Sequence, residues 1–149
     1  MTWRIGEILI QKKFITWEQL NEVLEEQKKT KELTGEILVR RGYITRNLLY
    51  KSLAEQSGLS FVDLKRTKIN PKAVEKIPMS IAEKYTILPV EIYDDILTLA
   101  IGNTLQAWPE KELRQLAGVK EIRCVLSLPD DIESAIRNVY ATDTGSRAL

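Results

Sequence analysis

One segment near the start of this chain occurs twice, and this duplication limits what the chain can fold into more than any other feature. Residues 4–27 return 29 positions later as residues 33–56, and ten of the aligned pairs are identical, from Gly6 with Gly35 to Gln27 with Gln56. A repeat of this length is one supersecondary unit that cannot bury its own apolar face, so the two copies should pack on each other. We therefore expect a ligand of this region to bind between the copies.

Apolar spacing predicts that each copy is a helical hairpin. Ile5, Ile8 and Leu9 share one face of a short first helix, and Ile37 and Leu38 do so in the second copy. Thr16 followed by Gln19 has the form of a capping box, and Thr45 is the equivalent cap. The inward faces of the second helices are then Leu20, Val23, Leu24 and Gln27 in the first copy, and Leu49, Leu53 and Gln56 in the second.

Two polar or small positions are repeated on these inward faces, and each has two explanations. Gln27 and Gln56 must find hydrogen-bond partners or cost about 1 to 3 kcal/mol each. They either bond the free carbonyls of nearby helix ends or serve a ligand. Gly6 and Gly35 each cost a helix about 1 kcal/mol relative to alanine, so something must approach closely. That neighbour is either a helix of the other copy or a ligand phosphate or ring.

The remainder, residues 58–141, alternates helical and strand patterns. A short strand is expected at Phe61–Leu64, a helix from Pro71 to Ile77 after the Asn70 cap, and a further helical turn at 80–85. Strands are expected at 87–93, 96–101 and 121–126, and helices at 105–117 and after Pro129. Asp94 and Asp95 fit the turn of a hairpin better than an acid–base pair. The predicted class is α+β with a mixed sheet: a helical subdomain at 1–57, an α/β subdomain at 58–141 and a disordered tail at 142–149.

Composition removes several classes of function. With 22 basic and 21 acidic side chains there is no strong field to favour nucleic acid, and no apolar run is long enough for membrane insertion. The chain has no histidine, and its one cysteine, Cys124, lies in an apolar run that suits a core residue better than a nucleophile. The nearest approach to a phosphate loop, Gly118-Val-Lys120, lacks the required spacing. We therefore expect a cytoplasmic protein that is not an enzyme and requires no cofactor or metal.

The repeat and the segments after it resemble a known family. The motif appears as Arg4-Ile5-Gly6, Ile15-Thr16, Leu20, Leu24 and Gln27, again as Gly35, Gly42, Ile44-Thr45, Leu49, Leu53 and Gln56, and is followed by Phe61-Val-Asp-Leu64 and Leu97-Thr-Leu-Ala-Ile-Gly102. Over about residues 3–141 this pattern resembles the N-terminal domain of type II secretion and type IV pilus assembly ATPases. In that family a motor domain follows, and this chain does not contain one.

The resemblance implies two roles. One is docking of the ATPase onto an inner-membrane assembly-platform protein. The other, in the subgroup typified by the MSHA pilus ATPase, is binding of cyclic di-GMP across the two motifs. Arginine can bond guanine O6 and N7, an amide can bond a base edge, leucines cover purine faces, and glycine lets backbone meet phosphate. The positions implied for this ligand are Arg4, Ile5, Gly6, Leu9, Leu20, Leu24, Gln27, Gly35, Leu38, Gly42, Leu49, Leu53 and Gln56.

The chain departs from the motif at several positions. Lys13 stands where the motif has glycine, and Asn103 stands where ligand-binding relatives carry an aspartate. Leu33 and Thr34 replace the basic residue and leucine that begin the second motif. Losing one bidentate arginine–guanine contact costs about 1 to 3 kcal/mol. The leading interpretation is therefore a docking and regulatory module, with a cyclic di-GMP sensor as the alternative.

Overall fold

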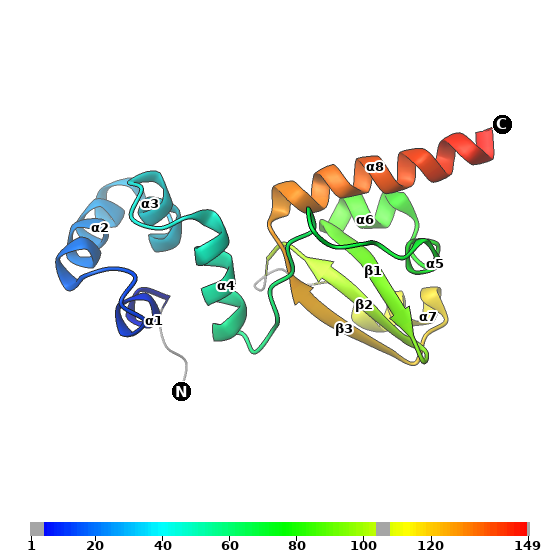
Figure 1. Cartoon of the computed structure of the whole chain (residues 1–149), viewed down its shortest axis with the longest axis horizontal. Coiled ribbons are helices and arrows are strands. Elements are labelled where there is room, and N and C mark those ends of the chain that lie inside the picture. Colours follow the sequence, from blue (N-terminus) through cyan, green and yellow to red (C-terminus); the bar gives the residue numbers. More distant parts are fainter. Residues whose placement is uncertain (1–4, 104–107, 149) are drawn as a thin grey trace. The chain divides into compact units, whose positions relative to one another are not determined.

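The computed structural model describes the backbone of residues 5–103 and 108–148, and the side chains of these residues as far as Tyr140. Contacts between residues divide the chain into two compact units, Met1–Gly58 and Leu59–Leu149. The division falls one residue after the boundary expected from the sequence. The elements of both units are labelled in Figure 1.

The first unit, which we call the helical unit, contains two successive helical hairpins. The first hairpin pairs α1 (Ile5–Gln11) with α2 (Trp17–Thr30), and the second pairs α3 (Thr34–Arg40) with α4 (Arg46–Gln56). Thr16 accepts a hydrogen bond from the Gln19 amide at 3.1 Å, and the Gln19 side chain accepts from the Thr16 amide at 2.9 Å, which completes the predicted capping box. Thr45 caps α4 in the same way through the Leu48 amide, at 3.1 Å. Both predicted caps are confirmed.

The turns inside the two hairpins have the same backbone geometry. Phe14 donates its amide to the Leu9 carbonyl at 2.9 Å, and its equivalent Tyr43 donates to Leu38 at 3.0 Å. These bonds close helices α1 and α3 in a motif that requires a left-handed residue just after the helix. Gly42 takes that conformation with a φ of 79°, whereas the first copy places Lys13 there with a φ of 65°. The backbone of the turn is therefore the same in both copies, although the first copy has lysine where the second has glycine.

Replacing Lys13 by glycine should stabilise the helical unit by about 1 kcal/mol, because a side chain in the left-handed region carries a steric cost that glycine avoids. The measurement is the free energy of unfolding in urea, followed by far-ultraviolet circular dichroism. The reverse change at the equivalent position, Gly42→Lys, is the matched control and should destabilise by a similar amount. Equal stability of all three proteins would contradict the strain assigned to Lys13.

The two hairpins share one hydrophobic core, as the repeat predicts. Helix α1 packs against α3 and α4, and α2 packs against α3. The core side chains come in equivalent positions from both copies: Leu9 with Leu38, Ile15 with Ile44, Leu20 with Leu49, joined by Val23 and Ile37. Neither hairpin could bury these side chains alone, since each supplies only half of the apolar surface.

The second unit, which we call the α/β unit, is built on a three-stranded mixed sheet in the order β1-β2-β3. Strands β1 (Ile87–Tyr93) and β2 (Ile96–Ile101) form an antiparallel hairpin, and β3 (Glu121–Leu126) pairs with β2 in parallel. The hairpin turns at Asp94 and Asp95, both with positive φ, which is the geometry of a tight two-residue turn. The predicted α+β class, the hairpin and its turn are confirmed.

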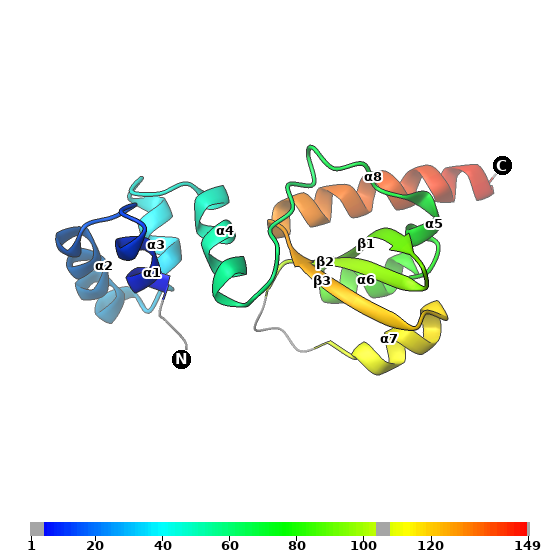
Figure 2. The same cartoon turned by 60° about the horizontal axis from the view of Figure 1, so that its bottom comes forward.

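Helices cover the sheet. Side chains of α5 (Pro71–Val74), α6 (Met79–Tyr85) and α8 (Pro129–Ala148) join Leu88, Val90 and Ala100 of the sheet in one core. Helix α7 (Glu110–Ala117) contacts β3. In Figure 2 it lies on the other side of the sheet from α8. Tyr140 of α8 is buried and donates its hydroxyl to the Ile77 carbonyl at 2.7 Å, which ties α8 to the segment between α5 and α6.

Some predicted elements differ in extent from those observed. Phe61 forms only an isolated parallel bridge with Leu126. The backbone of residues 60–62 is hydrogen-bonded to β3 only at Leu126, the last residue of that strand, so no longer strand forms there. Helix α5 ends at Val74, three residues before the expected Ile77. Of the predicted 105–117 helix, residues 105–107 lie outside the described residues, and the helix begins only at Glu110, with Pro109 as its N-cap. The backbone of 142–148 continues α8, where the sequence indicates a tail, since extending an existing helix costs little even after the apolar periodicity ends.

Candidate functional site

The repeated glycines are explained by packing inside each hairpin. A Cβ built on Gly6 would lie 2.7 Å from Cδ1 of Leu20, and one built on Gly35 would lie 2.6 Å from Cδ1 of Leu49. Both leucines are buried in the shared core, so neither has free space to move into. The close neighbour is therefore the second helix of the same copy, which is neither of the two alternatives, the other copy or a ligand, that the sequence left open. No ligand is needed to account for either glycine.

The predicted ligand positions divide into a buried and an accessible group. Leu9, Leu20, Leu38 and Leu49 are at most 5% exposed and form the core, which leaves them little surface for a ligand. The accessible group lies around that core. Ile5 and Leu53 are partly buried at its edge, Gln27 and Gln56 are half-buried in the last turns of α2 and α4, and Leu24 and Gly42 are exposed. Arg4 lies outside the described residues.

The accessible positions and the buried glycines Gly6 and Gly35 form two sets that correspond in the repeat, and we call these sets half-sites. The first half-site comprises the start of α1, at Ile5 and Gly6, with Leu24 and Gln27 of α2. The second comprises the start of α3, at Leu33 to Gly35, with Leu53 and Gln56 of α4. The glycine–leucine packing holds the start of the first helix against the second helix in each copy. Each half-site thus includes an apolar side chain and an amide one helical turn apart on the second helix of its copy.

Ion pairs between the copies show that the two hairpins are related by an approximate two-fold axis. Arg41 at the end of α3 pairs with Glu26 of α2 at 2.6 Å, and Lys12 at the end of α1 pairs with Glu55 of α4. Lys12 and Glu55 are the repeat equivalents of Arg41 and Glu26, so exchanging the copies converts one pair into the other. A simple head-to-tail array would not have this reciprocity. The two half-sites are consequently related by the same two-fold.

The ion pair between Arg41 and Glu26 belongs to a larger network of ionic and hydrogen bonds between the two copies. Arg40 bonds Glu26 and also Glu32, the latter at 2.9 Å, while Tyr43 donates its hydroxyl to Glu22 at 2.7 Å. Hydrogen bonds from Arg40 and then Arg41 lower the pKa of the Glu26 carboxyl, and the same bonds raise the pKa of both guanidinium groups. The network lies at the surface around Glu26, whose side chain is 19% exposed, and its geometry indicates a role in setting how the copies align.

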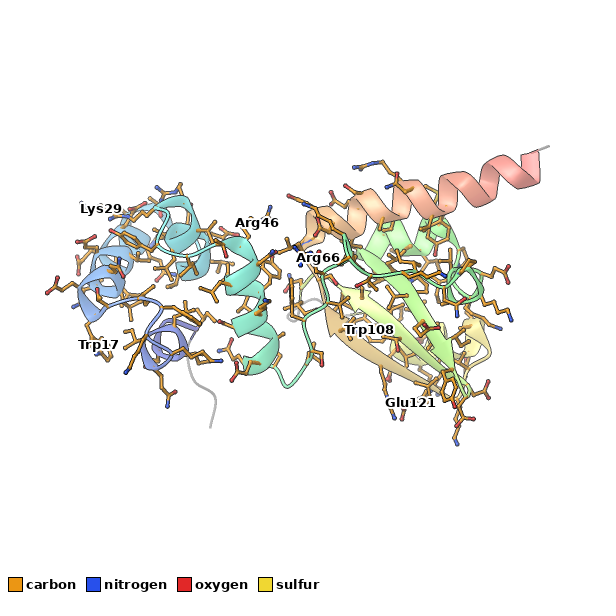
Figure 3. The ribbon with its side chains drawn as sticks, in the orientation of Figure 1. Trp17, Lys29, Arg46, Arg66, Trp108 and Glu121 are labelled. Carbon is orange, nitrogen blue, oxygen red and sulfur yellow. The ribbon has the colours of Figure 1, made fainter. Side chains whose placement is uncertain are left out.

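Exposed aromatic side chains in the first copy are a feature that the sequence analysis did not select. Phe14, in the turn between α1 and α2, is 43% exposed, and Trp17, the first residue of α2, is 62% exposed. Figure 3 shows Trp17 pointing away from the helices of its unit. The equivalent residues of the second copy are Tyr43, held in the ionic network, and Arg46. The sequence contained one signal that could have identified these side chains, namely the difference between the two copies at equivalent positions.

The described residues offer no group of acidic, cysteine or histidine side chains that could hold a metal ion. Burial, reinforced by the charge of Glu110, raises the pKa of Cys124 to about 11, so its thiol stays protonated at neutral pH. Asn103 is exposed after the end of β2. Among the described helices, none has both the length and the apolar character required to cross a lipid bilayer.

Comparisons with known proteins agree with this architecture. The family model described as the MshEN domain matches residues 57–146. The type IV pilus assembly ATPase PilB of Myxococcus xanthus is 30% identical over 141 residues, which are 95% of this chain and 25% of that protein. PilB of Thermus thermophilus is 33% identical over 138 residues, covering 92% of this chain and 15% of that protein. Bacteriophage adsorption protein B of Escherichia coli K12 is 28% identical over 141 residues, covering 95% of this chain and 19% of that protein.

Solved structures share the fold. A structure of MshE with cdg (cyclic di-GMP) superposes with a TM-score of 0.78 at 22% identity, covering 93% of this chain and 99% of the other. The N-terminal domain of XpsE gives a TM-score of 0.59 at 19% identity, covering 90% of this chain and 92% of the other. The fold and the sequence define an N-terminal-type domain of secretion and pilus ATPases. The chain belongs to the MshEN domain family, and it spans a quarter or less of the length of the curated relatives named above.

Proposed function

We propose that this chain is a non-catalytic regulatory and docking module of a type II secretion or type IV pilus assembly ATPase system. The two-fold helical unit carries the proposal, because it presents a binding surface built from two copies and none of the catalytic motifs sought in the sequence occurs. In this proposal the module acts in the cytoplasm, works together with an ATPase motor domain, and binds an inner-membrane assembly-platform protein. Its relatives among the PilB ATPases support the link to such a motor.

The exposed aromatic pair supports a docking role for the helical unit. Phe14 and Trp17 lie beside Lys13, which is also exposed, so the patch combines apolar area with positive charge. Large aromatic side chains at the centre of an interface supply most of its binding energy. The second copy has Tyr43 and Arg46 at the equivalent positions and lacks this exposed aromatic pair, so in this proposal only the first copy meets the partner.

Changing Trp17 to arginine, the residue of its equivalent position, should weaken binding to the cytoplasmic part of the assembly-platform protein by at least about tenfold. Biolayer interferometry with the immobilised platform segment measures this. Leu116→Arg, at an exposed leucine of the α/β unit, is the matched control and should bind normally. Failure of the unaltered chain to bind any candidate platform segment would count against docking.

A second candidate function, binding of cyclic di-GMP, is favoured by the two-fold relation of the half-sites. Cyclic di-GMP has two guanines and two phosphates related by a two-fold, so each half of the ligand can meet one half-site in the same way. Leu24 and Leu53 can cover the purine faces, while Gln27 and Gln56 can bond base edges. The structural likeness to MshE, whose structure was solved with this nucleotide, also supports the assignment.

Titration of the chain with cyclic di-GMP should release heat and saturate at one ligand per chain. Arg4→Ala should weaken binding about tenfold to hundredfold, as expected for loss of a bidentate guanine contact. Gln27→Ala should weaken it by about fivefold. Asn21→Ala, at an exposed position of α2, is the control and should leave the affinity unchanged. Absence of heat with ligand at high micromolar concentration would remove the sensor function and leave docking.

A further inference from the structure

Strand β3 is the outer strand of the sheet, and most of its outer side has no partner. The sheet order β1-β2-β3 leaves β3 without a neighbouring strand on that side, which Figure 2 shows at the margin of the α/β unit. Among the described residues, only the last residue of the strand is bonded there. Leu126 donates its amide to the Ser60 carbonyl and accepts a bond from the Val62 amide, both at 2.9 Å. The earlier part of the strand is open.

The bonds of Leu126 identify which other backbone groups face outward. Successive residues of a strand direct their amide and carbonyl to opposite sides, so Cys124 and Ile122 direct theirs the same way as Leu126. The Glu121 amide points inward and bonds the Asp95 carbonyl at 3.3 Å, which agrees with this alternation. Within the described part of the chain, Ile122 and Cys124 have no backbone partner on the outer side. Their amides and carbonyls form a short open edge, which proteins usually cover or block.

Two oppositely charged side chains stand on this open edge. Glu121 and Arg123 are two residues apart in the strand and therefore project from the same face. Arg123 bonds Glu121 through Nε at 2.7 Å, and the two side chains remain 67% and 48% exposed. Figure 3 shows Glu121 at the margin of the sheet. Charges of one sign would repel a second copy of this edge, whereas two charges of opposite sign can be complementary to themselves.

The positions of the free groups and of the charges select one register for an antiparallel pair of such edges. Pairing Ile122 with Cys124 of a second copy sets Arg123 opposite Arg123, and like charges directly opposite are destabilising. Pairing Cys124 with its counterpart requires the outward groups of Leu126, which are already bonded within the chain. Pairing Ile122 with its counterpart sets Glu121 opposite Arg123 on both sides of the two-fold axis, so that opposite charges meet.

We propose that β3 is a self-association edge, to which a second copy of this chain adds its own β3 in antiparallel orientation. The amide and carbonyl of each Ile122 bond those of the other, Glu121 of each copy faces Arg123 of the other, and the two sheets become continuous. Because the contact is small and forms few backbone bonds, the association should be weak, with a dissociation constant of about 100 μM. This surface belongs to the α/β unit and is independent of the binding proposed for the helical unit.

Sedimentation velocity of the whole chain between about 10 μM and 1 mM measures the self-association. Arg123→Glu and Glu121→Arg should each weaken it by at least about tenfold, since either change sets like charges opposite each other twice. Combining the two changes exchanges the charges and keeps them complementary, so the double variant should associate within about threefold of the unaltered chain. Arg137→Glu, at an exposed position of α8, is the matched control and should associate normally.

Hydrogen exchange of single amides, followed by nuclear magnetic resonance on the unaltered chain, gives a second readout that needs no variant. The amides of Ile122 and Cys124 should exchange quickly in dilute solution and more slowly as the concentration rises. Those of Arg123 and Val125, which face β2, should be protected at every concentration. Circular dichroism establishes that the variants are folded.

A chain that stays monomeric at about 1 mM would overturn the proposal. Single charge reversals that associate as well as the unaltered chain would do the same, and so would a folded double variant that does not recover.

Discussion

Gly35→Val should lower the free energy of unfolding of the helical unit by about 3 kcal/mol, close to the upper end for overpacking a core. The first carbon of the new side chain would lie 2.6 Å from Cδ1 and 3.4 Å from Cγ of Leu49. Leu49 is 5% exposed and surrounded by core side chains of both copies, so it cannot turn away without displacing them. Valine adds two further methyl groups at the same place, and its better helix propensity recovers only a few tenths of this loss.

Urea unfolding followed by circular dichroism measures the effect, with Glu36→Val as the matched control. Glu36 is the next residue of α3 and is exposed, so the same valine should change stability there by less than about 0.5 kcal/mol. Combining Gly35→Val with Leu49→Ala should restore at least about 1 kcal/mol relative to the sum of the single changes. A mild effect of Gly35→Val alone would show that packing does not require this glycine, and a ligand contact would then be its explanation.

Leu38→Ala and Leu99→Ala should each destabilise only the unit that contains the residue, by about 2 to 5 kcal/mol. Both leucines are fully buried, Leu38 in the core shared by the hairpins and Leu99 in β2 of the sheet. Because each unit has its own core, we expect the helical unit and the α/β unit to unfold as separate cooperative blocks.

Hydrogen exchange of backbone amides, read by mass spectrometry on peptides of each unit, distinguishes the blocks. Leu38→Ala should reduce protection in α1 to α4 and leave β1 to β3 protected, and Leu99→Ala should do the reverse. Leu116→Ala, at an exposed leucine of α7, is the control and should affect neither unit. A loss of protection in both units from either core substitution would contradict two independently folding domains and the boundary near Gly58.

Local elements were predictable wherever a short-range signal determines them. The capping box at Thr16, the equivalent cap at Thr45 and the turn at Asp94 and Asp95 depend on residues within a few positions of one another. The ends of α5 and α8 were less predictable. A helix stops or continues according to what the flanking chain packs against, and α8 extends to Ala148 beyond its apolar face.

The candidate site shows the same limit. The sequence identified the repeated glycines and glutamines, but it left the close neighbour of Gly6 open between the other copy and a ligand. The contacting side chain is Leu20 of the same hairpin. It also selected Leu9 and Leu38 as ligand contacts, and these side chains are fully buried in the core. Apolar residues follow the same helical spacing whether they face the core or a ligand. Periodicity therefore cannot distinguish a core position from a ligand-binding position.

The amino-acid sequence by itself determined that this protein contains two equivalent helical hairpins ahead of an α/β unit, because the duplication, the helix caps and the apolar spacing depend on residues close together in the chain. Only the tertiary structure decided how the copies pair. The reciprocal ion pairs of Lys12 with Glu55 and of Arg41 with Glu26 join residues far apart in the chain, and they show a two-fold arrangement that no local pattern contains. That arrangement is what turns two repeated motifs into two matched half-sites, since symmetry is a property of packing between segments and not of either segment alone.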